Sequence, residues 1–196
     1  MAFRDLAERI GRGSTVLFIS PKVFHKKFDW AGHLDQPLGW LPLVNQGKVE
    51  LAYNPGIYRP DYWARNHPLF EGLPSGGLMD FTFYRDILSD DGYVGIDVPS
   101  VAVAGNINTS FNYASGLSLT VHALGAGEFI LNTLHIRREL DRHPAAERLL
   151  RNMLNYAGRN TDAPPVELPP DFDEELAARG IRELDWADEK AGVWTI

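Results

Sequence analysis

The chain has 196 residues, which is enough for one well-buried domain with a tail but too few for two ordinary domains and a linker. Its formal net charge of −7 argues against nucleic acid and anionic membrane surfaces as partners, because both require a basic patch. The absence of cysteine excludes disulfides, thiolate metal sites and cysteine nucleophiles. No stretch approaches the roughly 20 apolar residues that cross a bilayer. The sequence therefore predicts a soluble protein, and the cytoplasm is the favoured compartment.

The first two predicted elements are a helix and a strand. Apolar residues between 3 and 10 recur at helical spacing, and Gly11 and Gly13 end the helix. The run TVLFIS at 15–20 is apolar enough for a buried strand. Because the chain begins inside a helix, we expect it to be a fragment of a longer polypeptide.

The next part of the chain mixes irregular segments with short elements. Residues 21–47 carry several prolines, glycines and bulky aromatic residues, which is typical of a flap that lies on the core or on a partner. Residues 48–53 predict a strand, and 61–70 a short helix with Pro60 near its start. Turns marked by glycine and proline follow between residues 67 and 88.

The second half contains the strongest signals for strands and for a helix. Residues 101–107 predict a strand, and 117–124 and 128–134 predict a hairpin joined by the sequence GAG. The sheet should therefore be mixed, with parallel strands early and an antiparallel pair late. From Pro144 the apolar residues change to helical spacing, and Gly158 follows the last of them. In that helix we expect Leu150 and Met153 to face the sheet, and Arg148 and Asn152 to face water.

These signals divide the chain into a domain and a tail. Residues 1–158 form the predicted α/β domain, 159–172 a proline-rich linker, and 173–196 an acidic helical tail that carries Leu176, Ala177 and Ile181. Trp186 and Trp194 should dock the tail on its own domain or on a neighbour, because two free tryptophans would be unusual.

Three motifs together carry a resemblance to a known family. They are HPLFEGLP at 67–74, GAGEFILNTL at 125–134 and AAERLLRNMLNYA at 145–157. In combination they resemble the class I glutamine amidotransferase-like domain, especially the copies appended to bacterial glycoside hydrolases of the family 2 and family 42 β-galactosidase type, and the trehalose-utilisation (ThuA-like) proteins. The resemblance implies a flavodoxin-like three-layer α/β fold. It also implies that one or two strand–helix units are missing at the N-terminus.

The resemblance does not bring the catalytic residues of the amidotransferases with it. That branch uses a cysteine nucleophile and a late His–Glu pair, whereas this chain has no cysteine and only His135 near the histidine position. The expected function is therefore that of a non-catalytic accessory domain of a carbohydrate-active protein, serving assembly or shaping the substrate side. The alternative is a stand-alone sugar-processing enzyme of the trehalose-utilisation type. In either case we expect self-association, because the truncated sheet and the aromatic flap would leave apolar surface uncovered.

Several polar clusters are candidate sites, each with a simpler structural interpretation. Asp80 and Asp86 could act as a carboxylate pair in glycoside hydrolysis, unless Arg85 pairs with one of them and Tyr84 packs in the core. His67 could take part in catalysis, although it more simply fixes a turn.

Two further clusters suggest ligands. An amide-rich loop after a strand suits sugar hydroxyls, but asparagine is also common in turns; its candidate residues are Asn106, Asn108, Asn112 and Tyr113. His25, Asp29 and His33 would share one face of a helix and could hold a divalent metal, although Gly32 makes a regular helix doubtful there. Common cofactor motifs are absent from the sequence, so we expect no cofactor.

Overall fold

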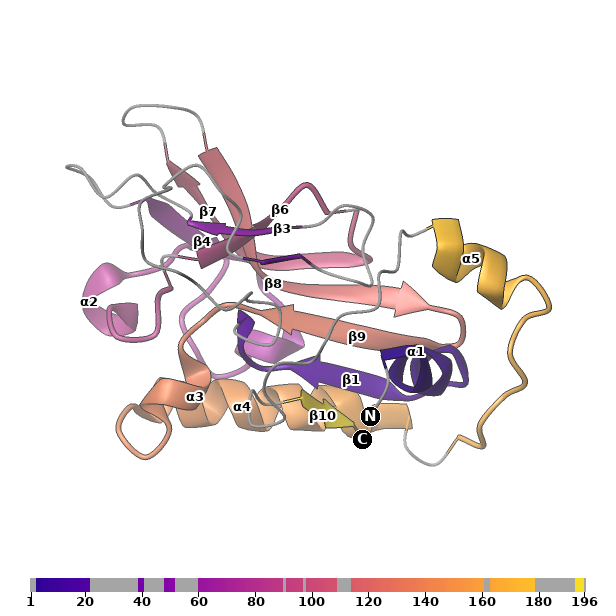
Figure 1. Cartoon of the computed structure of the whole chain (residues 1–196). Coiled ribbons are helices and arrows are strands. Elements are labelled where there is room, and N and C mark those ends of the chain that lie inside the picture. Colours follow the sequence, from indigo (N-terminus) through magenta and orange to yellow (C-terminus); the bar gives the residue numbers. More distant parts are fainter. Residues whose placement is uncertain are drawn as a thin grey trace.

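The protein is a mixed α/β domain built on one sheet (Figure 1). The computed structural model describes residues 3–21, 39–40, 48–51, 60–89, 91–96, 98–108, 114–160, 163–178 and 193–195. The helices are α1 (Phe3–Gly11), α2 (Phe81–Tyr84), α3 (Ile136–Glu139), α4 (Pro144–Ala157) and α5 (Phe172–Ala178), with the short 3-10 helices η2 (Pro68–Phe70) and η3 (Gly158–Asn160). The strands are β1 (Thr15–Phe18), β2 (Gly39–Trp40), β3 (Lys48–Leu51), β4 (Asp61–Ala64), β5 (Gly77–Leu78), β6 (Asp91–Val94), β7 (Val101–Asn108), β8 (Ala114–Leu124), β9 (Gly127–Asn132) and β10 (Val193–Thr195).

The ten described strands form a branched sheet. Seven follow the order β10-β1-β9-β8-β6-β3-β2, while β7 pairs with the other edge of β8 and carries β4 and then β5. The predicted mixed sheet is confirmed, but among the described strands only β1 and β9 pair in parallel. The early strands β3 and β4 pair antiparallel with β6 and β7, against the expectation of early parallel pairing. The segments that join these pairs are long enough for either direction, so their antiparallel pairing depends on contacts between distant strands that local spacing does not show.

The pair β1–β9 is apolar on both faces and separates two cores. Val16 and Phe129 pack with α1 and α5 on one face. Leu17 and Ile130 point the other way and pack with α4. Successive strand residues face opposite sides, so each apolar strand serves both cores. At this part of the sheet the chain has three layers, with α1 and α4 on opposite faces (Figure 1).

The predicted hairpin and the predicted long helix are both present. Strands β8 and β9 pair antiparallel from Leu119 to Leu124, and Gly125 takes a φ of 58° in the turn between them. This left-handed conformation favours glycine. Helix α4 begins with Pro144 in its first turn, and its start is capped by His143, whose Nδ1 accepts a hydrogen bond from Ala145 N at 3.2 Å.

The segment predicted as a helix over 61–70 is instead strand β4 followed by η2, so this prediction is wrong. Tyr62 and Ala64 are buried in the core, while Trp63 between them is half-buried, which is the two-residue alternation of a strand. Trp63 lies opposite Gly105 of β7, and a Cβ at Gly105 would come within 2.8 Å of the indole. The sheet partner, which the local sequence does not reveal, therefore decides the conformation of this segment.

Helix α4 turns toward the sheet largely as predicted, with one exception. Leu149 and Met153 are fully buried, Leu150 is half-buried at the edge of the same core, and Arg148 is exposed. Asn152, however, is buried instead of facing water, so that part of the prediction is wrong. Its side-chain amide is buried without cost because it donates hydrogen bonds to the carbonyl groups of Leu69 and Glu71.

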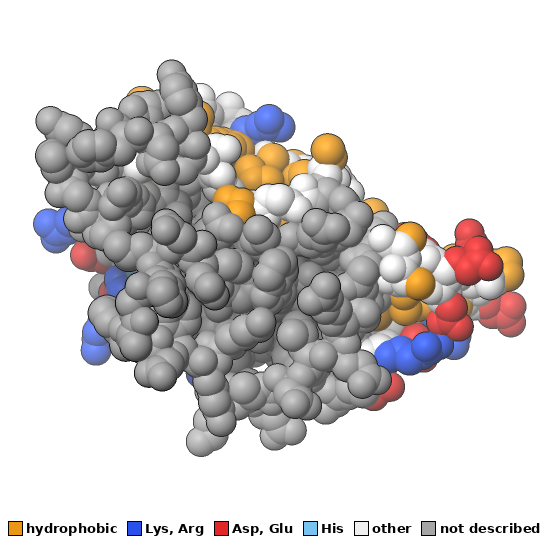
Figure 2. All heavy atoms as spheres, turned by 45° about the horizontal axis from the view of Figure 1, so that its top comes forward, with side chains coloured by type: hydrophobic (Ala, Val, Ile, Leu, Met, Phe, Trp, Pro, Cys, Tyr) orange, Lys and Arg blue, Asp and Glu red, His pale blue; other side chains and the backbone are white. Residues whose placement is uncertain are grey.

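The C-terminal segments pack on the domain. Val166 N donates a hydrogen bond to Arg12 O, and Leu168 packs beside α1. In α5, Leu176 is buried, whereas Ala177 is exposed; Ile181 and Trp186 lie outside the described residues. Strand β10, which contains Trp194, pairs antiparallel with β1, so the predicted docking of the tail on its own domain is confirmed there. The acidic side chains around α5 gather at one end of the molecule (Figure 2).

The burial of α4 makes a prediction about stability. Leu149→Ala should lower the free energy of unfolding by about 2–5 kcal/mol, because it leaves a cavity between α4 and the sheet. Arg148→Ala is the matched surface variant and should change it by less than about 0.5 kcal/mol. Urea denaturation followed by circular dichroism measures both. Equal losses in the two variants would mean that the observed face of α4 is not the packed one.

Candidate functional site

The acidic cluster around α2 is occupied by structural interactions. Asp80 is the N-cap of α2, and its Oδ1 accepts a hydrogen bond from Thr82 N at 2.7 Å. Asp86 lies 3.5 Å from Arg85, and both side chains are more than half exposed, so this ion pair adds little. Tyr84 is fully buried and donates to Pro74 O at 2.6 Å. Burial raises the pKa of Tyr84 to about 12, which keeps its hydroxyl protonated.

His67 also has a structural task, because it caps η2. Its Nδ1 accepts a hydrogen bond from Leu69 N at 3.3 Å, and its ring centroid lies 5.4 Å from that of Tyr156. Burial, and to a smaller extent the charge of Arg159, lower the pKa of His67 below its usual 6.5. The ring is therefore neutral at pH 7, and since Nδ1 is an acceptor, the proton lies on Nε2.

Asn152 holds the turn after His67 against α4. Its Nδ2 donates to Leu69 O at 3.1 Å and to Glu71 O at 2.9 Å. Both hydrogens of this buried amide are used, so the backbone of the turn is fixed to a rigid helix. The sequence contains one sign of this role, namely an amide placed between the apolar residues Leu149 and Met153.

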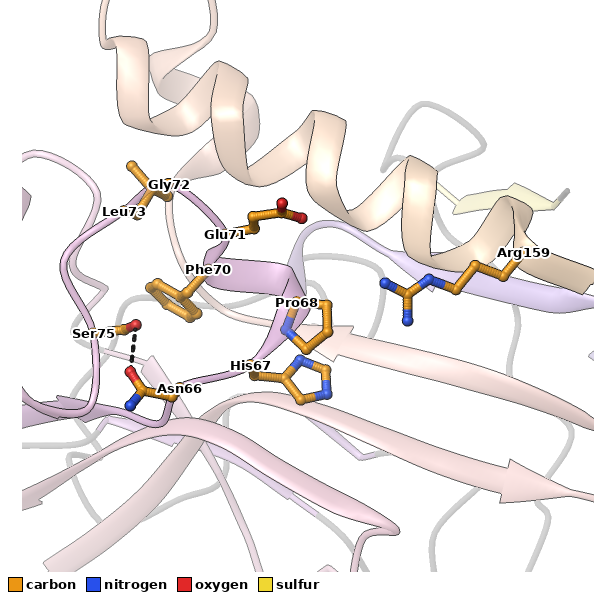
Figure 3. A pocket seen from close by; sticks show the side chains of 9 residues that line it. All are labelled: Asn66, His67, Pro68, Phe70, Glu71, Gly72, Leu73, Ser75 and Arg159. Atoms are coloured by element: carbon orange, nitrogen blue, oxygen red, sulfur yellow. Dashed lines mark hydrogen bonds between the residues drawn. The ribbon is translucent and has the colours of Figure 1, made fainter.

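A shallow pocket of about 370 Å³ opens beside this turn (Figure 3). In the figure, the guanidinium of Arg159 and the imidazole of His67 point toward one another across it. Asn66 and Ser75 form another part of the wall, where Ser75 Oγ donates to Asn66 Oδ1 at 3.2 Å. The remaining lining residues are Pro68, Phe70, Glu71, Gly72 and Leu73. Sequence reasoning singled out His67 but missed Arg159, which follows the helix as an ordinary charged residue.

A second hollow, of about 350 Å³, contains one of the predicted ligand residues. Asn106 lines it together with half-buried Trp63 and with Gly116. Asn106 is fully buried; its Oδ1 accepts from Gly116 N at 3.1 Å, while its Nδ2 has no hydrogen-bond partner within the described part of the chain. A buried donor without a partner costs free energy because it has lost its hydrogen bonds to water. A ligand oxygen that accepted a hydrogen bond from Nδ2 would remove this cost.

The other predicted site residues are not brought together. Asn108 is buried at the end of β7, and half-buried His135 precedes α3 without a side-chain cap bond. Asn112, Tyr113 and the trio His25, Asp29 and His33 lie outside the described residues. Within the residues that the structure describes, no group of three or more histidine, aspartate or glutamate side chains could hold a metal ion.

Comparison with known proteins adds no relative. Neither the models of protein families nor the curated proteins give a match to this sequence. Among the helices of the described ranges, none is long and apolar enough to cross a membrane. The function must therefore be argued from the residues of the chain itself.

The lowered pKa of His67 makes the stability depend on pH. Between the pKa of His67 in the folded protein and its pKa of 6.5 in the unfolded chain, the unfolded chain binds more protons at this residue. The contribution of His67 to the free energy of unfolding is therefore fully present above pH 6.5. It is lost as the pH falls through the pKa of the folded state. The free energy of unfolding, measured in urea between pH 7.5 and 5, should therefore fall less with decreasing pH in His67→Asn than in wild type. Asparagine keeps a cap but does not titrate.

His143→Asn is the matched control for this experiment, because it replaces the other histidine that caps a helix through Nδ1. It should leave the contribution of His67 in place. Identical pH dependence in wild type and His67→Asn would contradict the assignment.

Proposed function

We propose that this chain is a non-catalytic accessory domain of a carbohydrate-active protein, of the amidotransferase-like kind found with β-galactosidase-type glycoside hydrolases. The supporting observation is that the side chains suited to acid–base chemistry are used to hold the backbone. The carboxylate of Asp80 and Nδ1 of His67 both accept backbone N–H groups at helix starts. The hydroxyl of Tyr84 is bound to a carbonyl. The domain then serves assembly, or shapes the substrate side of its parent protein.

The flavodoxin-like assignment is part of the same proposal. It is supported by the parallel pair β1–β9 and by the helices α1 and α4 on its two faces. The antiparallel strands from β4 to β8 and the edge strand β10 would then be additions around a smaller three-layer centre.

The competing proposal is a sugar-processing enzyme of the trehalose-utilisation type, and one observation favours it. Asn106, whose Nδ2 has no partner among the described residues, lines a hollow beside Trp63. An amide donor next to an aromatic face suits a carbohydrate, since ligand sites combine apolar walls with a few placed polar groups. We propose this hollow as the place of a carbohydrate ligand under either function. Catalysis would in addition require Asp80 or His67 to leave its cap.

An activity screen separates the two proposals. The purified chain should show no turnover of aryl glycosides or keto-sugars above the background of the buffer. Asp80→Asn is the informative variant, because asparagine keeps the N-cap of α2 but cannot exchange a proton. Its thermal midpoint should stay within a few degrees of wild type. Turnover that Asp80→Asn abolishes would overturn the accessory-domain proposal in favour of the enzyme.

We also propose that the chain forms a symmetric homo-oligomer through the β5 edge of the sheet. Among the described strands β5 pairs only with β4, and its Leu78 is 75% exposed opposite Trp63. Ile107 on β7 is 46% exposed and also lines the hollow at Trp63 and Asn106, so this interface would border the proposed carbohydrate site. An open edge with apolar side chains tends to pair with another chain, and a two-fold dimer is the commonest result.

Light scattering tests the oligomer. The wild-type chain should have a mass above the 21.9 kDa of one copy at high micromolar concentration, and the double variant Leu78→Ser, Ile107→Ser should return toward one copy. Val166→Ser is the matched control, because Val166 is as exposed as Ile107 but lies beside α1. A monomeric wild type, or an oligomer unaffected by the double variant, would count against this interface.

A further inference from the structure

We propose that the pocket between His67 and Arg159 binds a small hydroxylated ligand through one acidic group, a carboxylate or a phosphate. The pocket is separate from the hollow at Trp63 and Asn106, and the inference does not depend on the proposed accessory function. It rests on an available cation, on two oriented neutral donors, and on a rigid wall.

The cation is Arg159. Its Cζ lies 5.0 Å from the ring centroid of Tyr156, so the guanidinium stacks on an aromatic face. Within the described residues it forms no ion pair with a carboxylate, although the protein has an excess of acidic residues. Its planar donors therefore remain available for an acidic group, which they can bind in a bidentate manner.

Two neutral donors belong to residues that line the same pocket. His67 presents Nε2–H, because its Nδ1 is an acceptor for the backbone. The oxygen of Asn66 is occupied by Ser75 Oγ, which leaves Nδ2 to donate. Gly76 makes room for this amide: a Cβ at Gly76 would lie 2.6 Å from Asn66 Oδ1, and its φ of 87° also favours glycine.

The wall of the pocket is held in place before any ligand binds. Asn152 fixes the backbone of residues 69 and 71 to α4, and Tyr156 of the same helix supports both His67 and Arg159. Donors that are already oriented cost little reorganisation on binding, which favours affinity.

The remaining lining residues indicate the kind of molecule. Glu71 also lines the pocket, and its carboxylate accepts hydrogen bonds but repels negative charge, so the hydroxyl groups of the ligand should face Glu71 and its acidic group should face Arg159. Pro68, Phe70 and Leu73 supply apolar surface. A volume of about 370 Å³ falls at the small end of ligand sites, which run from roughly 300 to 1,000 Å³. These features together fit a single sugar acid or sugar phosphate, or an acid of similar size.

Titration of the full chain, followed by proton–nitrogen NMR at pH 7 and low salt, tests the inference. The probes are glucuronate, glucose 6-phosphate and glucose, so that the acidic group is the main variable. We expect saturable shifts of the Arg159 side chain and of the amides of residues 66–76 with at least one acidic probe, and much weaker ones with glucose. Which acidic probe binds more tightly decides between carboxylate and phosphate.

Variants make the result specific. Arg159→Gln should weaken binding about ten- to hundred-fold, the range for losing a charge-assisted hydrogen-bonding group, and Arg159→Lys should weaken it less. Arg151→Gln removes an exposed arginine of α4 outside the pocket and should bind as wild type does. Unchanged thermal midpoints would show that the variants fold. No shift at these residues with either acidic probe, equal shifts with glucose, or equal affinity in Arg159→Gln would overturn the inference.

Discussion

The parallel contact of β1 with β9 is the interaction on which the layers of this domain depend. Both strands are apolar on both faces, so this pair contributes side chains to the hydrophobic core on each side of the sheet. A buried amide closes its end: Asn132 Nδ2 donates to Ile19 O at 3.1 Å and to Leu134 O at 2.9 Å, and its Oδ1 accepts from Leu134 N at 3.2 Å. Because a buried amide with these bonds is satisfied only in one arrangement, it specifies where the two strands stop.

Several histidine and aspartate side chains support the backbone of the fold. His67, Asp80 and His143 each accept a hydrogen bond from the N–H group two residues ahead, at the start of a helix. The helices that begin after His67 and Asp80 have only three and four residues, so each of these caps satisfies a large share of their exposed donors. The histidines and the aspartate are thus explained without catalysis. Arg159 differs from them, because its donors are not used in this way by the described residues.

The sequence predicts those parts of the fold that are determined locally. The helix of α4, the hairpin β8–β9 and the burial of Met153 follow from spacing and from turn residues. Strand β4 does not, since its conformation depends on pairing with β7 at a distant position in the sequence. The burial of Asn152 was not predicted, because helical spacing gives only the direction of a side chain. An amide is favourable at this position because the turn at residues 69–71 offers it two carbonyl acceptors.

The pockets were predictable to a similar extent. His67 and Asn106 are candidate residues in the sequence, and both line hollows in the structure. Their neighbours Arg159 and Trp63 could not be found from spacing, because each arrives from a separate element. A site assembled from distant segments leaves no local pattern, and its residues become visible only when the chain is folded.

The position of β1 between β9 and β10 has a consequence for how the chain acquires its structure. The bond that closes the end of β1 joins residues 113 positions apart, and β10 is more distant still. Proteins whose contacts span such separations fold slowly, because a large loop must close before the contact stabilises it. During synthesis, β1 leaves the ribosome before β9 and β10, so both of its edges stay unpaired until these later strands have been made. This early apolar strand is therefore exposed to aggregation for longer than its partners β9 and β10, and a chaperone would have more time to bind it.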